Sequence, residues 1–264
     1  MKVNFIILGR LGNAIFRYLA SITMCILYDG EYVINEYQSH NCTDELFDMI
    51  SNNFIKSPGN ILSFTNSNVA LNMSGYYQHD TIYKKLKSQI IEYISNHKEH
   101  YVLTDGVNAG DRNYQQFYMN DILNTPPAFN KKYKNVLHVR LEDFVNLNLF
   151  LPVERIINLL DKNIVNDELC IVCKSPTSQF EKDYISTITE HLKTKNIQCV
   201  VESNDVLTDY YILKEADTLI CSKSTLSWCA AYFSNSIIHC YLPDYNISPN
   251  SMTCKYPINN TSLY

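Results

Sequence analysis

The second half of the chain alternates short apolar runs with segments of helical periodicity, and this alternation restricts the fold more than any other feature. Apolar runs that predict buried strands lie at 136–139, 169–173, 197–201, 218–221 and 237–241. Helices are predicted between them at 152–161, 180–195, 208–215 and 224–233. Strands that alternate with helices in this way predict an α/β fold with a doubly wound parallel sheet.

The first half predicts the same class of structure with weaker signals. A continuous apolar run at 3–8 predicts a buried parallel strand, and a glycine turn at 9–13 leads into a helix. A second strand is predicted at 32–35 and an amphipathic helix at 80–94. Residues 98–134 show no clear pattern and are expected to be irregular.

A domain boundary is expected just before the regular half, which gives an N-terminal domain over 1–132 and a C-terminal domain over 133–264. The chain has 264 residues, of which 46% are hydrophobic, so that sizeable cores can form. The net charge of −5 and the pI of about 5.8 argue against a general nucleic-acid binder, which needs a basic face. A local basic pocket for a small anion is compatible with this charge.

The nine cysteines lie mostly inside apolar, strand-like runs, where a thiol behaves as a small hydrophobe. Cys170 and Cys173 alone have C-x-x-C spacing, and they fall within a predicted strand rather than in a turn. We therefore expect neither a zinc site nor a redox site there. The pattern is typical of a reducing compartment.

The N-terminal sequence MKVNFIILGRLGN differs from a secretion signal, because its apolar core is short and no small-residue cleavage site follows. No run reaches the ~18 apolar residues of a membrane span. We expect a soluble, cytoplasmic protein from a bacterium or a large DNA virus.

Three strand ends carry residues suited to an anion. Gly9–Asn13 leads into a helix N-terminus, where backbone N–H groups can bind one. His138–Asp143 ends a buried strand with four ionisable groups, and ligands of open α/β sheets bind at the carboxyl ends of strands. Ser222–Thr225 adds hydroxyls and Lys223 at a second helix N-terminus. For His138–Asp143 a simpler interpretation is a surface salt bridge, and for Ser222–Thr225 it is an ordinary helix cap. An anion held between the two halves of the chain would use all three strand ends.

Four segments, in the same order over residues 9–233, resemble fucosyltransferase motifs. GRLGNAIFRY is similar to the GGLGNQ-type motif of family 11 α1,2-fucosyltransferases and to the GRFGNQ motif of protein O-fucosyltransferases. GYYQHDTIY resembles the GYFQ-type segment of family 11. HVRLEDF resembles the HxRRxD motif shared by α1,2-, α1,6- and protein O-fucosyltransferases. DYYILKEADTLICSKSTLSWCAAYF resembles an Asp-led helix followed by NSTFSWW.

The resemblance implies a GT-B fold, in which two Rossmann-like domains face each other across a cleft, and an inverting enzyme that needs no metal or other cofactor. The C-terminal domain would bind most of a nucleotide-sugar donor. Arg140 would bind its diphosphate, His138 would support that strand end, and Asp143 would orient Arg140 or the sugar. Ser224 and Thr225 would bind phosphate.

On the N-terminal side, the resemblance assigns Gly12 and Asn13 to the diphosphate or the reacting sugar. Tyr77, Gln78 and His79 would lie near the glycan acceptor. No nucleic-acid or membrane partner is expected. Without a metal, arginine and helix N–H groups must stabilise the charge on the leaving diphosphate, and such donors contribute about 2.7–4 kcal/mol each in other enzymes.

Several positions depart from the family pattern. The family's second arginine is Leu141 here, and the Asn before its Ser-Thr pair is Lys223. The Phe and the second Trp of NSTFSWW are Leu226 and Cys229. We hypothesise that Lys223 restores the missing positive charge from the neighbouring strand end.

The general base must take a proton from an acceptor hydroxyl. Asp143, Glu142, His79 and Asp80 are candidates, and an SN1-like reaction with a weak base is an alternative. Asp80 also suits a helix N-terminus. On an extended strand, Glu142 would share a face with Arg140 and Asp143 would point the other way. Glu142 and Asp143 rank equally.

The sequence thus predicts a glycosyltransferase that moves a sugar to a glycan hydroxyl, with fucose from GDP-fucose as the default. Two alternatives stay open. One is a glycosyltransferase that uses another nucleotide sugar, such as UDP-xylose, which Leu141 motivates. The other is a non-catalytic glycan- or nucleotide-binding module that lost activity with the second arginine.

Overall fold

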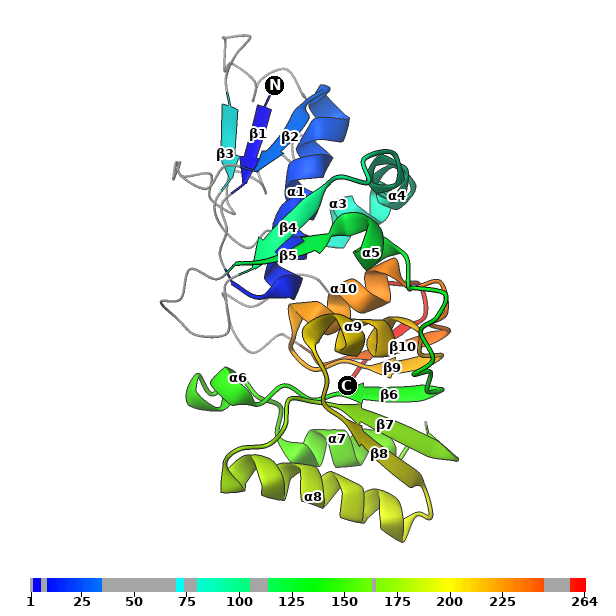
Figure 1. Cartoon of the computed structure of the whole chain (residues 1–264). Coiled ribbons are helices and arrows are strands. Elements are labelled where there is room, and N and C mark those ends of the chain that lie inside the picture. The colour runs from blue at the N-terminus through cyan, green and yellow to red at the C-terminus, as the bar shows by residue number, and fades with distance from the viewer. Residues whose placement is uncertain are drawn as a thin grey trace. The chain divides into compact units, whose positions relative to one another are not determined.

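The computed structural model describes residues 2–5, 9–34, 70–73, 80–104, 114–162, 165–244 and 257–264. The chain divides into two compact units, Met1–Asn124 and Thr125–Tyr264 (Figure 1). This division precedes the expected boundary at 132/133, because the intervening residues bond to the second unit. Thr125 Oγ1 donates to Glu215 Oε1 at 2.5 Å, and Lys131 Nζ donates to Glu202 Oε2 at 2.8 Å.

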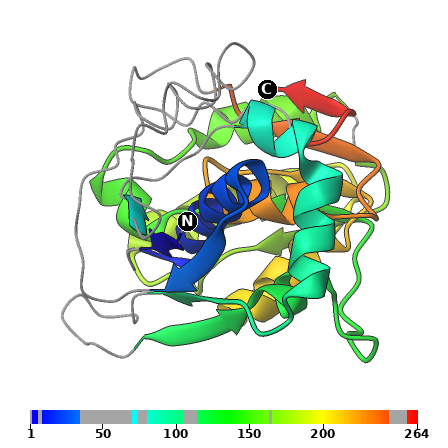
Figure 2. The same cartoon turned by 90° about the horizontal axis from the view of Figure 1, so that it is seen from above.

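The second unit is built on a six-stranded parallel sheet with the strand order β11-β10-β9-β6-β7-β8. Its strands are β6 (Asn135–His138), β7 (Glu168–Val172), β8 (Gln198–Glu202), β9 (Thr218–Ile220), β10 (His239–Leu242) and β11 (Thr261–Leu263). Counted along the chain and read from β8, this order is 3-2-1-4-5-6, that of the Rossmann-type doubly wound fold. The predicted α/β class is confirmed. The sequence did not predict β11, the short outer strand drawn in red in Figure 2.

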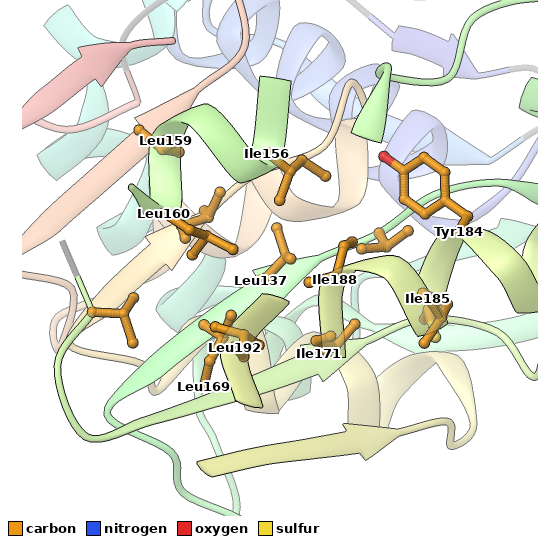
Figure 3. Close-up of a cluster of buried hydrophobic side chains, with 14 of the residues drawn as sticks. Leu137, Ile156, Leu159, Leu160, Leu169, Ile171, Tyr184, Ile185, Ile188 and Leu192 are labelled. Carbon is orange, nitrogen blue, oxygen red and sulfur yellow. The ribbon is translucent and has the colours of Figure 1, made fainter. Parts of the chain in front are cut away.

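Helices cover both faces of this sheet (Figure 1). They are α7 (Val153–Leu160), α8 (Gln179–Thr194), α9 (Val206–Lys214) and α10 (Thr225–Phe233). The short helix α6 (Glu142–Asn146) lies in the connection that follows β6. On the α7–α8 face, buried side chains of the sheet and of both helices form one hydrophobic cluster (Figure 3). Leu137 from β6, Ile156 from α7 and Ile188 from α8 are each at most 1% exposed. Burial of a side chain of this size stabilises the fold by about 1.5–3 kcal/mol.

Side-chain caps fix where the helices that follow the strands begin. At α8, Ser178 Oγ accepts the N–H of Glu181, and Glu181 Oε2 accepts the N–H of Ser178, which is a capping box. These backbone hydrogen bonds lower the pKa of Glu181 to about 2. At α9, Asp205 Oδ1 accepts the N–H groups of Leu207 and Thr208, both at 3.0 Å. Because each cap contributes about 1 kcal/mol, the loops at this end of the sheet are well positioned.

The first unit contains a three-stranded parallel sheet with the order β2-β1-β3 and a separate antiparallel pair, β4 with β5. The strands are β1 (Lys2–Phe5), β2 (Glu31–Ile34), β3 (Ala70–Met73), β4 (Tyr101–Thr104) and β5 (Gln115–Tyr118). The helices are α1 (Leu11–Tyr28), α3 (Asp80–Lys85), α4 (Lys87–Asn96) and α5 (Met119–Leu123). Helix α1 is almost entirely buried, as expected for a helix that is apolar on most of its faces.

Two expectations for the first half were wrong. The single helix predicted at 80–94 is two helices, and the chain changes direction between them at Leu86 (Figure 2). The segment 98–134, expected to be irregular, contains β4, β5 and α5. Strand β5 reads QQFY and is mostly exposed, so that its pairing with β4, rather than any apolar pattern, defines it as a strand.

Candidate functional site

The carboxyl ends of β6 and β9 are neighbours in the sheet, and they mark the point where its strand order reverses. Leu137 of β6 pairs with Ile220 of β9. Immediately beyond this pair, His138 Nδ1 and Ser222 Oγ are hydrogen-bonded at 3.0 Å. In doubly wound sheets this reversal point is where ligands bind. The structure therefore joins two of the three predicted anion-binding segments.

His138 is a buried, neutral side chain that positions this junction. Burial, and secondarily the positive charge of Arg140, lower its pKa to about 3. An imidazole with this pKa carries no positive charge near neutral pH. It fixes the hydroxyl of Ser222 by their hydrogen bond and contributes no charge to an anion site.

Arg140 is held by two carboxylates of its own loop. Its Nη1 lies 2.7 Å from Glu142 Oε2, and its Nη2 lies 2.8 Å from Asp143 Oδ1. Lys174, which follows β7, places its Nζ 3.1 Å from Glu142 Oε1. The guanidinium carbon also lies 5.4 Å from the centroid of the Phe144 ring. These two cations and two carboxylates balance in charge, so the strand end contains the salt bridge of the simpler interpretation.

Glu142 and Asp143 would lie on opposite faces only if the strand continued through them, and it has already ended before them. Strand β6 ends at His138, and the short helix α6 begins at Glu142, so that both carboxylates reach Arg140. Glu142 has a φ of +34°, a left-handed backbone that a residue with a side chain rarely adopts. Backbone of this kind is frequent at functional sites, where contacts such as these ion pairs hold it in place.

Leu141, which stands where the family has its second arginine, does not face this site. Its side chain is 6% exposed and belongs to the hydrophobic cluster under α7 and α8. A guanidinium at this position would have to enter an apolar core. At this position the chain therefore has an apolar side chain where the resemblance would place a charge.

The end of β9 differs from the end of β6 in its charge. Ser224 caps α10, its Oγ accepting the N–H of Leu226 at 3.3 Å, and Thr225 is the first helical residue. Lys223, just before the cap, is half-buried, and burial and then the nearby charge of Arg155 lower its pKa. Among the residues that the structure describes, no Asp or Glu side chain forms an ion pair with Lys223.

A small pocket connects these strand ends. Its polar side is formed by His138, Arg140, Ser222 and Lys223. Its remaining walls come from the loop after β6 and from α7 and α8, with Phe144, Leu149, Phe150, Leu151, Ile156 and Tyr184 among the lining residues. Its volume of about 10 Å³ has room for a water-sized group, and its polar side chains converge on that space.

Sequence reasoning missed two cations at this end of the sheet. Lys174 directly follows the predicted strand at 169–173, so that an inspection of every predicted strand end would have found it. Arg155 lies in the first turn of α7, and no local pattern marks it. Its hydrogen bond to the main-chain oxygen of Tyr264 depends on how α7 crosses the sheet.

The predicted residues of the N-terminal half lie in the first unit or outside the described residues. Helix α1 already begins at Leu11, so Gly12 and Asn13 are helical rather than part of the turn. Gly9 has a φ of +84°, and a Cβ at this position would lie 3.2 Å from Asn13 Nδ2, which accounts for the glycine. Asp80 is the first residue of α3, but its side chain is not described. Tyr77, Gln78 and His79 all lie outside the described residues.

Other predicted features concern metals, thiols and membranes. Within the described ranges, no three or more His, Cys, Asp or Glu side chains group as metal ligands would. Cys170 lies in β7 and Cys173 just after it, and both are buried free thiols, as the strand interpretation predicted. Over the same ranges, no helix has both the length and the apolar character to cross a bilayer.

Comparison with known proteins gave similarities of structure but not of sequence. No protein-family description and no curated protein sequence matches the chain. The E. coli heptosyltransferase WaaC with ADP-2-deoxy-2-fluoro heptose has a TM-score of 0.45 at 8% identity, over 100% of this chain and 93% of that chain. POFUT1 in complex with GDP-fucose has a TM-score of 0.35 at 14% identity, over 90% of this chain and 72% of that chain. At such values the fold assignment rests on the strand order rather than on these similarities.

Proposed function

We propose that the protein is a glycosyltransferase that moves a sugar from a nucleotide donor to a glycan hydroxyl. The observation that carries the proposal is the joined end of β6 and β9, where the His138–Ser222 hydrogen bond, Arg140 and Lys223 meet at one pocket. The HVRLEDF and SKSTLSW sequences that supply these residues belong to two of the four segments that resemble fucosyltransferase motifs.

The donor would bind through its diphosphate at this pocket, with Lys223, Ser224 and Thr225 on the β9 side and Arg140 on the β6 side. In a GT-B arrangement of the two units, Gly12 and Asn13 would complete the site. The reaction would invert the anomeric centre without a metal, because cationic side chains and N–H groups can stabilise the leaving diphosphate. Fucose from GDP-fucose is the default donor, from the motif resemblance.

The general base remains a choice between Glu142 and Asp143. Glu142 is bound by both Arg140 and Lys174, whereas Asp143 forms one of the described ion pairs and its side chain is 44% exposed. The more accessible carboxylate can approach an acceptor hydroxyl with less rearrangement. We therefore propose Asp143 as the base, and expect an Asp143→Asn variant to lose transfer activity while still binding donor.

Two other functions are favoured by particular observations. The buried Leu141 removes one arginine of the family pattern and favours a donor other than GDP-fucose, such as UDP-xylose. The two carboxylates on Arg140 favour a module that binds a nucleotide or glycan without catalysis.

A panel of GDP- and UDP-sugars separates these functions. Hydrolysis or transfer with GDP-fucose supports the default, and turnover with another sugar nucleotide supports the alternative donor. Binding without turnover across the panel supports the non-catalytic module. Absence of both binding and turnover with every nucleotide sugar would contradict the proposal.

A further inference from the structure

Three aromatic rings form one wall of the pocket and continue beyond it. Phe150 and Tyr184 line the pocket itself. The ring centroid of Phe180 lies 5.2 Å from that of Phe150 and 6.2 Å from that of Tyr184. The rings of Phe150 and Phe180 meet at 75°, the edge-to-face arrangement that aromatic pairs prefer. We call Phe150, Phe180 and Tyr184 the aromatic wall.

The aromatic wall runs from the buried interior to the surface of the second unit. Tyr184 is 5% exposed, belongs to the hydrophobic cluster (Figure 3) and donates its hydroxyl hydrogen to the carbonyl oxygen of Leu151 at 2.8 Å. Phe180, by contrast, is 43% exposed. Leu149, which also lines the pocket, is 42% exposed. The apolar side of the pocket therefore extends onto the outside of the unit.

The exposed ring of Phe180 is held in place by its surroundings. Phe180 is the second residue of α8, whose start is fixed by the capping box of Ser178 and Glu181. Its contacts with Phe150 and Tyr184 hold the ring from the other side. A side chain that is already ordered loses little conformational freedom when a ligand packs on it, and burial of its apolar surface is favourable.

The two sides of the pocket differ in polarity in the same way as the two ends of a nucleotide. Arg140, Lys223 and the Ser222 hydroxyl lie on the polar side, which suits phosphate oxygens. The pocket has room for only a water-sized group, so a larger ligand with its phosphates there must extend along one of the walls. Aromatic side chains stack on nucleic-acid bases of every kind, because each base has a π-face.

We propose that Phe180 binds the base of the nucleotide donor, which stacks on the exposed part of its ring beside Leu149. The inference rests on the proposed function and deepens it, because it places the base at the start of α8. None of the four segments that resemble fucosyltransferase motifs includes this residue. Stacking of this kind accepts guanine and uracil alike.

Isothermal titration of the full chain with GDP, UDP and inorganic pyrophosphate tests the assignment. Phe180→Ala removes the ring and should weaken the binding of GDP and UDP by about fivefold or more. The affinity for pyrophosphate, which has no base, should stay unchanged. Phe180→Leu keeps an apolar side chain against Phe150 and Tyr184 but has no π-face, so it should also weaken the binding of both nucleotides.

Two further variants are controls. Phe180→Tyr keeps the ring and should bind the nucleotides like the wild type. Ile238→Ala removes an apolar side chain that is 65% exposed and lies just before β10, at the amino end of the strands. Because the pocket lies at their carboxyl end, this variant should also bind like the wild type.

The outcomes separate this inference from the proposed function. Wild-type binding of GDP or UDP that neither Phe180→Ala nor Phe180→Leu weakens overturns the stacking and leaves the glycosyltransferase proposal standing. Equal weakening of pyrophosphate and nucleotides also overturns it, because the effect then lies in the pocket rather than at the base. A wild type that binds neither nucleotide nor any nucleotide sugar overturns both proposals. Phe180→Leu decides the matter even if Phe180→Ala fails to fold.

Discussion

The ends of β6 and β9 lie next to each other in one sheet, yet they differ in whether their cations are paired with carboxylates. At β6, Arg140 and Lys174 are balanced by Glu142 and Asp143. At β9, Lys223 forms no ion pair with a described Asp or Glu side chain, and burial and then the charge of Arg155 lower its pKa. A motif arginine can thus be paired by carboxylates of its own loop, while the lysine at the neighbouring strand end has no such carboxylate among the described residues.

The strongest test of this contrast is to remove the charge at the balanced end. An Arg140→Met variant removes a partner of both Glu142 and Asp143, and Glu142, whose side chain is 16% exposed, has little access to water. Loss of one partner of a buried pair costs about 3–5 kcal/mol, and for this half-buried site we expect a loss of about 2–3 kcal/mol in the free energy of unfolding. Chemical denaturation of the variant and the wild type measures it.

The exposed Lys182→Met variant is the control for that experiment. If Arg140→Met loses less than about 0.5 kcal/mol but no longer binds pyrophosphate, the end of β6 is the anion site and the contrast is reversed. A large loss of stability with retained binding of pyrophosphate supports the contrast between the two strand ends.

The junction between the two ends should depend on pH through His138. Its pKa is about 3 in the folded protein and about 6.5 in an unfolded chain, so the unfolded state takes up the proton first as the pH falls. The stability that His138 contributes is complete above pH ~6.5 and declines below it, by about 2 kcal/mol at pH ~5. Unfolding at the two pH values measures this loss.

Other groups titrate over the same range, so the contribution of His138 must be isolated. Burial raises the pKa of Asp209 to about 6, which favours the folded state as the pH falls and opposes the effect of His138. A His138→Asn variant keeps a polar partner for Ser222 and removes the titration. At the lower pH the wild type should therefore lose stability relative to the variant. An unchanged difference in their free energies of unfolding would show that His138 is accessible to protons.

The hydrogen bond across the junction is the next smaller effect. A Ser222→Ala variant leaves the buried Nδ1 of His138 without the bond at 3.0 Å. An unsatisfied buried polar atom costs about 1–3 kcal/mol, and we expect a loss near the lower limit. Thermal unfolding measures it, with Ser186→Ala on the exposed face of α8 as the control. Equal stability of the two variants would mean that the strand ends are joined by packing alone.

The smallest effect is expected at Lys174, whose side chain is 58% exposed. Exposed ion pairs contribute about 0–1 kcal/mol, so Lys174→Met should change the free energy of unfolding by less than that. Its removal makes the β6 end more negative, and pyrophosphate should bind slightly more weakly, within about threefold. A loss of tenfold or more would place Lys174 in the anion site.

Much of the second unit could be predicted from sequence, because its elements have strong local signals. The apolar run before Arg140 and the helical periodicity of 180–195 required no knowledge of the remaining chain. A helix cap was predicted within Ser222–Thr225, and Ser224 is that cap. Strand β5 was missed because its mostly polar residues show no alternation of apolar and polar side chains. Its conformation is fixed by its pairing with β4.

Local patterns were sufficient to predict the α/β class, the parallel strands and the positions of polar residues at their carboxyl ends. Periodicity and capping depend on residues within one or two turns of each other, and a single sequence displays them. The packing of distant segments was needed to show that Leu141 enters the core, that Arg140 is paired with its own loop, and that Arg155 bonds to Tyr264. These outcomes depend on where α6 begins and on how α7 crosses the sheet, and neither is encoded in any local pattern.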